Sequence, residues 1–217
     1  MWKSAVAALA LAMAFASPAA ADPQTDQQIA ALAHAWDHAQ FEITGNDAKL
    51  TELQRLDAQS DQLARAHAGA AEPLVWEAII LSSEAGVEGG LGALGKVNRA
   101  RDLLLQAERI NPNALGDGSI YSSLGSLYYQ VPGFPLGFGN RDRAREYLER
   151  ALRMNPNGIE PNYFMADFLI RGNDYAHAAT YLERAQAAPP RPGREVADNG
   201  RRRDIAALMA QVRAHAH

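Results

Sequence analysis

Residues 141–157, RDRAREYLERALRMNPN, contain the pattern that decides the fold. Ala144, Leu148 and Ala151 stand at positions i, i+4 and i+7, so they form one stripe along a helix. The two alanines are small, which lets a neighbouring helix approach this stripe closely. Pro156 cannot continue a helix and predicts where it ends. The stretch therefore predicts an amphipathic helix that packs against a neighbour.

The same stripe occurs in two other stretches, NRARDLLLQAERINPN at 98–113 and NDYAHAATYLERAQAAPP at 173–190. The Ala, Leu, Ala and Pro positions shift by 44 residues from the first copy to the second, and by 34 from the second to the third. A second apolar segment precedes each copy, at 73–85, 119–130 and 160–172. Each unit is therefore predicted to be a helix pair, and units at a regular step indicate a helical repeat protein.

The second unit resembles the tetratricopeptide repeat (TPR) family. Its residues Tyr121, Leu124, Gly125 and Tyr128 follow that family's spacing, and the stripe from Ala144 to Pro156 completes it. The other units depart from the pattern, with Asn162 at the aromatic position of the third and with Ile80 and Ser83 at the Gly and Tyr positions of the first. The resemblance implies an all-α fold in which antiparallel helix pairs stack in a right-handed superhelix, an α-solenoid with a C-terminal capping helix. We expect a signal peptide at 1–21 and one TPR-like domain at 22–217, with helix pairs at 25–70, 73–112, 118–156 and 159–190 and a cap helix at 197–214.

Residues 1–21, MWKSAVAALALAMAFASPAAA, have the features of a secretory signal. Lys3 precedes an apolar run of about a dozen residues, and small residues follow at Ala19 and Ala21. The run is shorter than the roughly 20 residues that cross a bilayer. We expect cleavage between Ala21 and Asp22, export to the periplasm and no membrane span.

The composition excludes several classes of function. The chain has 21 Lys+Arg against 25 Asp+Glu and no Cys, so it lacks the basic excess that nucleic acid requires and cannot form thiolate metal sites. His34 and His38 share a helix face, but no third metal ligand is identifiable. Neither a nucleophile elbow nor a phosphate-binding loop is present. We expect no enzyme activity, no catalytic residues, no cofactor and no metal.

The second unit holds an insert of seven residues within 130–142, QVPGFPLGFGNRD, and the first unit has a similar extension through 86–95. Gly and Pro prevent a helix in the insert, while Phe134 and Phe138 make it apolar, so we expect it to fold back onto the repeats. Two interpretations stay open. The insert is either a plug that packs on its own repeat or a lid that contacts a ligand.

The first helices of successive units line the concave face of such a stack. The candidate binding residues are those of this face and of the insert: Ser126, Tyr129, Phe134, Phe138, Tyr163 and Asp167. They favour an exported scaffold that binds a protein partner. The alternative is a carrier of a small apolar ligand in a cleft under the 130–140 loop. An enclosed cavity on the order of several hundred Å³ would favour the carrier, and an open groove would favour the protein partner.

Residues 125–175, followed by APPRPGREVADNGRR at 188–202, are also similar to the TPR-like T component (TatT) associated with tripartite ATP-independent periplasmic (TRAP) transporters. The similarity lies in the VPGFPLGFG insert, the NPNGIEPNYF junction and the APPRPGR segment. It implies a periplasmic repeat protein that assembles with a substrate-binding protein, forms trimers and presents an apolar cleft or pore. The lipoprotein Cys is missing here, so membrane tethering is not expected.

Overall fold

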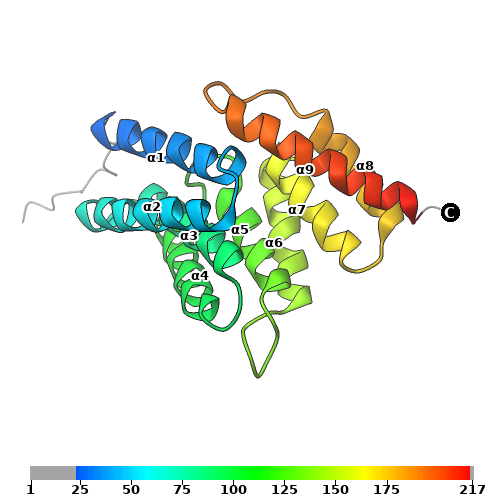
Figure 1. Cartoon of the computed structure of the whole chain (residues 1–217), viewed down its shortest axis with the longest axis horizontal. Helices are drawn as coiled ribbons and strands as arrows, with labels where there is room; N and C mark the ends of the chain where they lie inside the picture. The colour runs from blue at the N-terminus through cyan, green and yellow to red at the C-terminus, as the bar shows by residue number, and fades with distance from the viewer. Residues whose placement is uncertain (1–22, 216–217) are drawn as a thin grey trace, which may run out of the picture.

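The computed structural model describes residues 23–215, and every regular element within them is an α-helix. In chain order the helices are α1 (Pro23–Phe41), α2 (Asn46–Ala66), α3 (Ala71–Glu88), α4 (Ala93–Ile110), α5 (Ser119–Gln130), α6 (Arg141–Met154), α7 (Ile159–Ile170), α8 (Tyr175–Gln186) and α9 (Glu195–Ala214) (Figure 1). The expected all-α class is therefore confirmed. The signal segment 1–21 lies outside the described residues.

The repeated stripe forms the contact within each helix pair. Ala144, Leu148 and Ala151 are fully buried, as are the corresponding residues of α4 and α8. Gly125 of α5 faces this stripe, and a Cβ atom at Gly125 would lie 2.6 Å from Leu148 Cγ. Glycine at this position therefore lets α6 lie closer to α5 than any larger residue would allow.

The ends of α6 show how local sequence sets the helix bounds. The Asn140 side chain caps the N-terminus, because its Oδ1 accepts a hydrogen bond from the Arg143 N–H at 2.9 Å. At the other end, the backbone of Asn155 is no longer helical, as expected for a residue directly before Pro156. The helix thus begins and ends at residues that the sequence marks.

The buried side chains form two separate apolar cores. The smaller core joins α1, α2 and α3, and Trp36 and Trp76 meet in it edge to face with their ring centroids 5.9 Å apart. The larger core extends from α2 and α3 to α9. Because α3 contributes to both cores, it connects the first helix pair to the rest of the stack.

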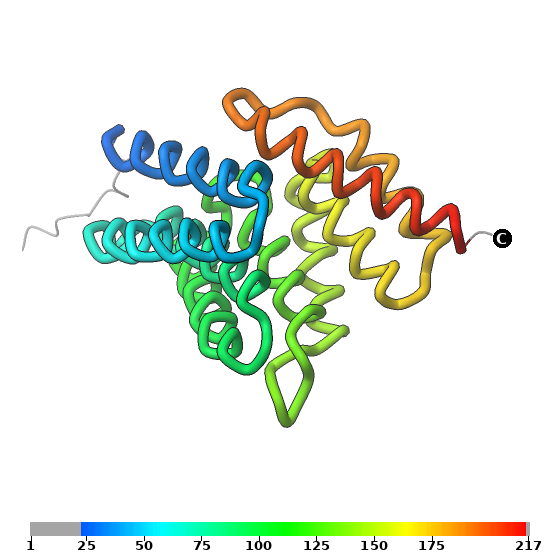
Figure 2. The backbone as a smooth tube through the Cα atoms, in the orientation of Figure 1, coloured from blue at the N-terminus to red at the C-terminus, as the bar shows by residue number. Residues whose placement is uncertain are grey.

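The concave side of the stack closes on itself. α1, α3, α5 and α7 contact one another in sequence, α7 contacts α9, and α9 contacts α1. Figure 2 shows α1, in blue, at the upper left and α9, in orange to red, running from the top of the view to the right, so that the end of α1 lies near the first half of α9. We call these five helices the helix ring. They line the concave side of the stack, and the contact between α1 and α9 joins the first and last helices.

The loop between α5 and α6 projects from the opposite end of the molecule (Figure 1). Its base is closed by two backbone hydrogen bonds, from Asn140 N to Tyr128 O at 2.8 Å and from Gly139 N to Pro132 O at 2.9 Å. The prediction that this insert folds back is wrong for its tip, since Phe134 is 95% exposed and Leu136 is 64% exposed. Phe134 therefore lies in solvent at the loop tip.

Candidate binding cleft

A cleft of about 1380 Å³ lies inside the helix ring. Its walls come mainly from α1, α3, α5, α7 and α9 and from the loops that follow α3, α4, α5 and α8, and α2 and α4 also contribute residues. The concave-face prediction placed the binding residues on the first helices of the pairs, and those helices do line this cleft. Most of the wall is apolar, with hydrogen-bonding and charged groups at defined places.

A stripe of serines forms the part of the wall that belongs to α5. These residues are Ser119, Ser122, Ser123 and Ser126, and their spacing of i, i+3, i+4 and i+7 puts them on one helix face. The Ser122 side chain is 2% exposed, and its Oγ has no hydrogen-bond partner within the described residues. Small hydroxyl side chains let a bound molecule approach the helix closely and offer it hydrogen bonds.

Apolar side chains from α1 and α3 continue the wall. Trp36 and Trp76 lie beside Ile79, and the Trp36 Nε1 donates a hydrogen bond to Ser83 Oγ at 2.9 Å. This bond fixes the Trp36 ring, and Ser83 is itself held by Ile79 O at 2.9 Å. The two indole rings therefore form a rigid apolar surface, which suits recognition of apolar side chains.

Four arginines line the wall on the side of α7 and α9. They are Arg171, Arg191, Arg194 and Arg201. Arg201 is 7% exposed, and it donates to Glu160 Oε2 and to Asp204 Oδ2, both at 2.9 Å. Its guanidinium also lies 4.1 Å from the centre of the Tyr163 ring. Each of these arginines has a carboxylate partner, so this wall carries little net charge and is held in place by ion pairs.

The structure brings together three of the predicted residues in one hydrogen-bond network. The Tyr129 hydroxyl donates to Asp167 Oδ2 at 2.7 Å, and Arg171 Nε donates to the same oxygen at 3.0 Å. Gln130 Nε2 donates to Ser126 Oγ at 2.6 Å and to the Tyr129 hydroxyl at 3.5 Å, and so links Ser126 to this network. Burial and the neighbouring Asp167 raise the pKa of Tyr129 well above its ordinary value. Ser126, Asp167 and Tyr163 line the cleft, whereas Tyr129 lies behind them.

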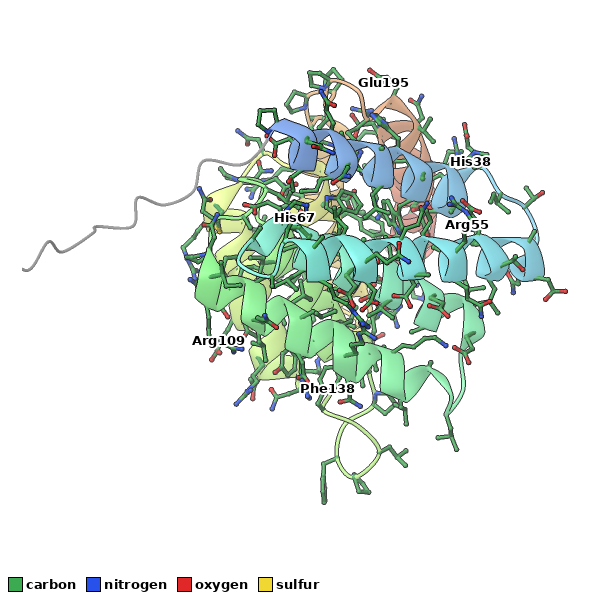
Figure 3. The ribbon with its side chains drawn as sticks, turned by 90° about the vertical axis from the view of Figure 1, so that its left-hand side faces the viewer. His38, Arg55, His67, Arg109, Phe138 and Glu195 are labelled. Atoms are coloured by element: carbon green, nitrogen blue, oxygen red, sulfur yellow. The ribbon has the colours of Figure 1, made fainter. Side chains whose placement is uncertain are left out.

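The two phenylalanines of the insert do not reach the cleft. Phe138 packs edge to face on Tyr128, with ring centroids 5.3 Å apart, and Arg101 lies 4.5 Å from its ring centre. Figure 3 shows Phe138 at the base of the projecting loop, beneath the body of the molecule. Phe134 stands in solvent at the loop tip. Of the candidate residues, Phe134, Phe138 and Tyr129 therefore do not line this cleft.

Other residues of the two extended loops take the place of these phenylalanines. Leu91 follows α3, Val131 and Leu136 follow α5, and all three line the cleft. Leu91 is 78% exposed, so these side chains extend the apolar wall at the rim. The sequence marked both loops as insertions but gave no signal for which side chains would face inward. The serine stripe, by contrast, was readable from its helical spacing.

The remaining sequence candidates have structural partners. His38 Nδ1 lies 2.7 Å from Glu42 Oε2, and His34 lies near Gly193. No group of three or more potential metal-binding side chains occurs within residues 23–215. In the same range no helix combines the length and the hydrophobicity that a membrane span requires.

Comparison with known proteins supports the repeat interpretation. Residues 136–212 match the tetratricopeptide repeat family model. Among solved structures, a thermophilic TPR protein of Thermus thermophilus is similar over 87% of this chain and 98% of its own, with a TM-score of 0.56 and 14% identity. PilF of Pseudomonas aeruginosa aligns over 87% of this chain and 91% of its own, with a TM-score of 0.35 and 16% identity. A search of curated proteins found no match.

The helix pairs and their closed stacking define an α-solenoid protein. The family match and the similarity to the solved structure from Thermus thermophilus are more specific than this class. They show that the chain has the fold of a TPR protein.

Proposed function

We propose that the protein is a non-enzymatic scaffold that binds a segment of a protein partner in the cleft of the helix ring. The observation that carries this proposal is the cleft itself, whose volume of about 1380 Å³ exceeds the roughly 300–1,000 Å³ typical of small-molecule pockets. Its wall combines fixed aromatic rings, small hydroxyl groups and arginines, a mixture that suits a polypeptide with both apolar and polar groups.

The proposed site of action is the periplasm. Residues 1–21 support export through their signal-like pattern. The mature chain purified from the native cell would then begin at Asp22, which N-terminal sequencing tests directly. A mature chain that begins at Met1 and stays in the cytoplasm would contradict export.

A finer form of the proposal makes the protein an accessory of a TRAP-type uptake system. It is supported by the similarity of residues 125–175 to the T component of such systems. The partner in that case would be a periplasmic substrate-binding protein, and the scaffold would form trimers.

A second candidate function, the carrier of a small apolar ligand, is favoured by the apolar part of the cleft. Trp36, Trp76 and Ile79 offer an apolar surface there. In this candidate function the ligand would lie inside the helix ring rather than under the 130–140 loop.

Native mass spectrometry of the protein isolated from its own cells separates the candidates. A protein chain that copurifies in defined stoichiometry supports the scaffold, and a lipid-like mass released on denaturation supports the carrier. We expect Ser123→Arg, on the cleft wall, to abolish copurification, while Glu149→Arg on α6, which does not line the cleft, leaves it intact. A partner that is retained by Ser123→Arg would show that binding does not use the cleft.

A further inference from the structure

The contact between α1 and α9 differs from every other contact of the helix ring. The other contacts join neighbouring units of the stack, whereas this contact joins the first and last helices of the described residues. Arg194, at the start of α9, donates from Nε and Nη2 to the two carboxylate oxygens of Asp37, each at 2.7 Å. These residues are 157 positions apart. We call the contact the α1–α9 seam.

In the second part of the seam, the aromatic side chain of Phe41 packs against Gly200. Phe41, the last residue of α1, covers Gly200 of α9 so closely that a Cβ atom at Gly200 would lie 2.2 Å from Phe41 Cδ1. Arg203 Nη2 donates to the Phe41 carbonyl at 3.1 Å. The Arg201 guanidinium also lies 5.4 Å from the centre of the Phe41 ring. The seam therefore includes a bidentate ion pair, packing of the Phe41 side chain on Gly200 and Arg201, and a hydrogen bond to the backbone.

No apolar core of the described residues crosses the seam. The buried apolar side chains of α1 belong to the smaller core with α2 and α3. Of the buried apolar side chains of α9, Ile205 and Val212 belong to the larger core, and Ala197 belongs to neither core. A buried ion pair contributes little net stability, because desolvation offsets most of its Coulombic attraction. Because proteins open first where buried apolar contacts are fewest, we expect the seam to separate before either core unfolds.

Both sides of the seam border the cleft. Ala33 and Trp36 of α1 line it on one side, and Arg194 and Arg201 line it on the other. The Arg194 guanidinium also lies 5.3 Å from the Trp76 ring centre. Separation of α1 from α9 would therefore widen the cleft and uncover its aromatic wall.

We propose that the α1–α9 seam is a latch, which opens while both cores stay folded and so admits the partner to the cleft. The role in partner binding rests on the proposed function. The opening itself does not, and it can be measured without any ligand.

Double electron–electron resonance tests the opening, because the chain has no Cys and accepts labels only where they are introduced. Nitroxides are placed at Gln27→Cys on α1 and Ala207→Cys on α9, both exposed. We expect a main distance and a second, longer one, with Asp37→Asn raising the share of the longer distance at least about tenfold, because it removes the charge that faces Arg194. Glu108→Gln, which removes an ion pair with Arg150 between α4 and α6, should leave both shares unchanged. A single distance that Asp37→Asn does not alter would overturn the latch.

A disulfide across the seam tests its effect on the cleft. A Cβ atom at Gly200 would lie 2.7 Å from that of Phe41, so a shift of about 1 Å brings a Phe41→Cys/Gly200→Cys pair to disulfide geometry. In a Trp2→Phe background the tryptophan fluorescence comes from Trp36 and Trp76. We expect acrylamide to quench the oxidised chain at least about twofold less than the reduced one. Equal quenching would overturn control of the cleft by the seam.

The opening of the seam and the proposed function can fail separately. If the seam opens but the protein binds no partner, the proposed function is refuted and the opening of the seam is still supported.

Discussion

Gly125 makes the closest approach between two helices of a pair, and its replacement tests the packing of the repeat. In Gly125→Ala the new methyl group would lie 2.6 Å from Leu148 Cγ and 3.3 Å from Ala144 O. We expect the free energy of unfolding to fall by about 1–3 kcal/mol in urea denaturation, because overpacking forces side chains and backbone to shift.

Gly95→Ala is the matched control for this substitution. Gly95 lies on the exposed side of α4, and a Cβ atom there would meet nothing within 4 Å. We expect this variant to be up to about 1 kcal/mol more stable than the natural chain. Equal stability of the two alanine variants would show that α5 and α6 are not in close contact at Gly125.

The contribution of Tyr129 to the free energy of unfolding depends on pH and can be measured at high pH. Its hydroxyl donates to Asp167, and burial raises its pKa well above the ordinary value of 10.0. The folded protein therefore keeps this proton when the unfolded chain loses it, so the stability that Tyr129 provides is present below pH 10 and is lost as the pH rises.

Tyr129→Phe should consequently have two effects. At neutral pH we expect a loss of about 1 kcal/mol, the worth of one hydrogen bond. Above about pH 10 the stability of the variant should fall less steeply than that of the natural chain. Urea unfolding at both pH values measures this, and identical slopes would mean that Tyr129 ionises freely in the folded state.

At the scale of elements, the α5–α6 loop separates into a tip and a base. Phe134 at the tip is 95% exposed, so Phe134→Ala should change the free energy of unfolding by less than about 0.5 kcal/mol. Phe138 at the base packs on Tyr128 and under Arg101, so Phe138→Ala should cost about 1–3 kcal/mol. Thermal unfolding of the two variants checks both values. A large loss from Phe134→Ala would mean that the tip packs on the repeats after all.

The helices could be predicted because each carries its pattern locally. The stripe of Ala144, Leu148 and Ala151 gives the buried face, and Pro156 gives the end. The path of the α5–α6 loop could not be predicted, because composition alone indicated burial for Phe134. What exposes it is backbone pairing at the base of the loop, and a sequence does not display that pairing.

At the scale of the whole molecule, the cleft was only partly predictable. Ser126, Tyr163 and Asp167 line it, as their positions on the first helices indicated. The wall that contains Arg194 depends on closure of the helix ring. That closure joins Asp37 to Arg194 across 157 residues, and no local pattern announces such a contact.

The acidic groups of the interior predict how stability depends on pH. Burial raises the pKa values of four carboxyl groups, those of Asp37, Asp57, Glu77 and Asp204. A raised folded pKa means that the folded state binds protons more tightly, so stability increases as the pH falls toward that value. Carboxyl groups with lowered pKa values, such as Asp61, have the opposite effect, which sets in as the pH falls through the ordinary pKa, 3.8 for Asp61.

As the pH falls from 7 toward the ordinary pKa values of 3.8 for Asp and 4.5 for Glu, we therefore expect the free energy of unfolding to rise. Asp37→Asn should reduce the slope without reversing it, because three of the four groups remain. Urea unfolding across this range measures both slopes. A loss of stability as the pH falls over this range would show that ion pairs, rather than burial, determine the pKa values of these carboxyl groups.

Photo-cross-linking from the cleft tests partner binding inside the helix ring most directly. The photoreactive residue p-benzoylphenylalanine is placed at Ser123 on the cleft wall, or at Glu149 on α6, which does not line the cleft, in cells that make the protein. Binding in the ring predicts one protein cross-linked from position 123 and not from 149, and the same protein, once purified, should bind the natural chain but not Ser123→Arg. Cross-links that are equal from both positions, or that arise only from 149, would show that the cleft does not hold the partner.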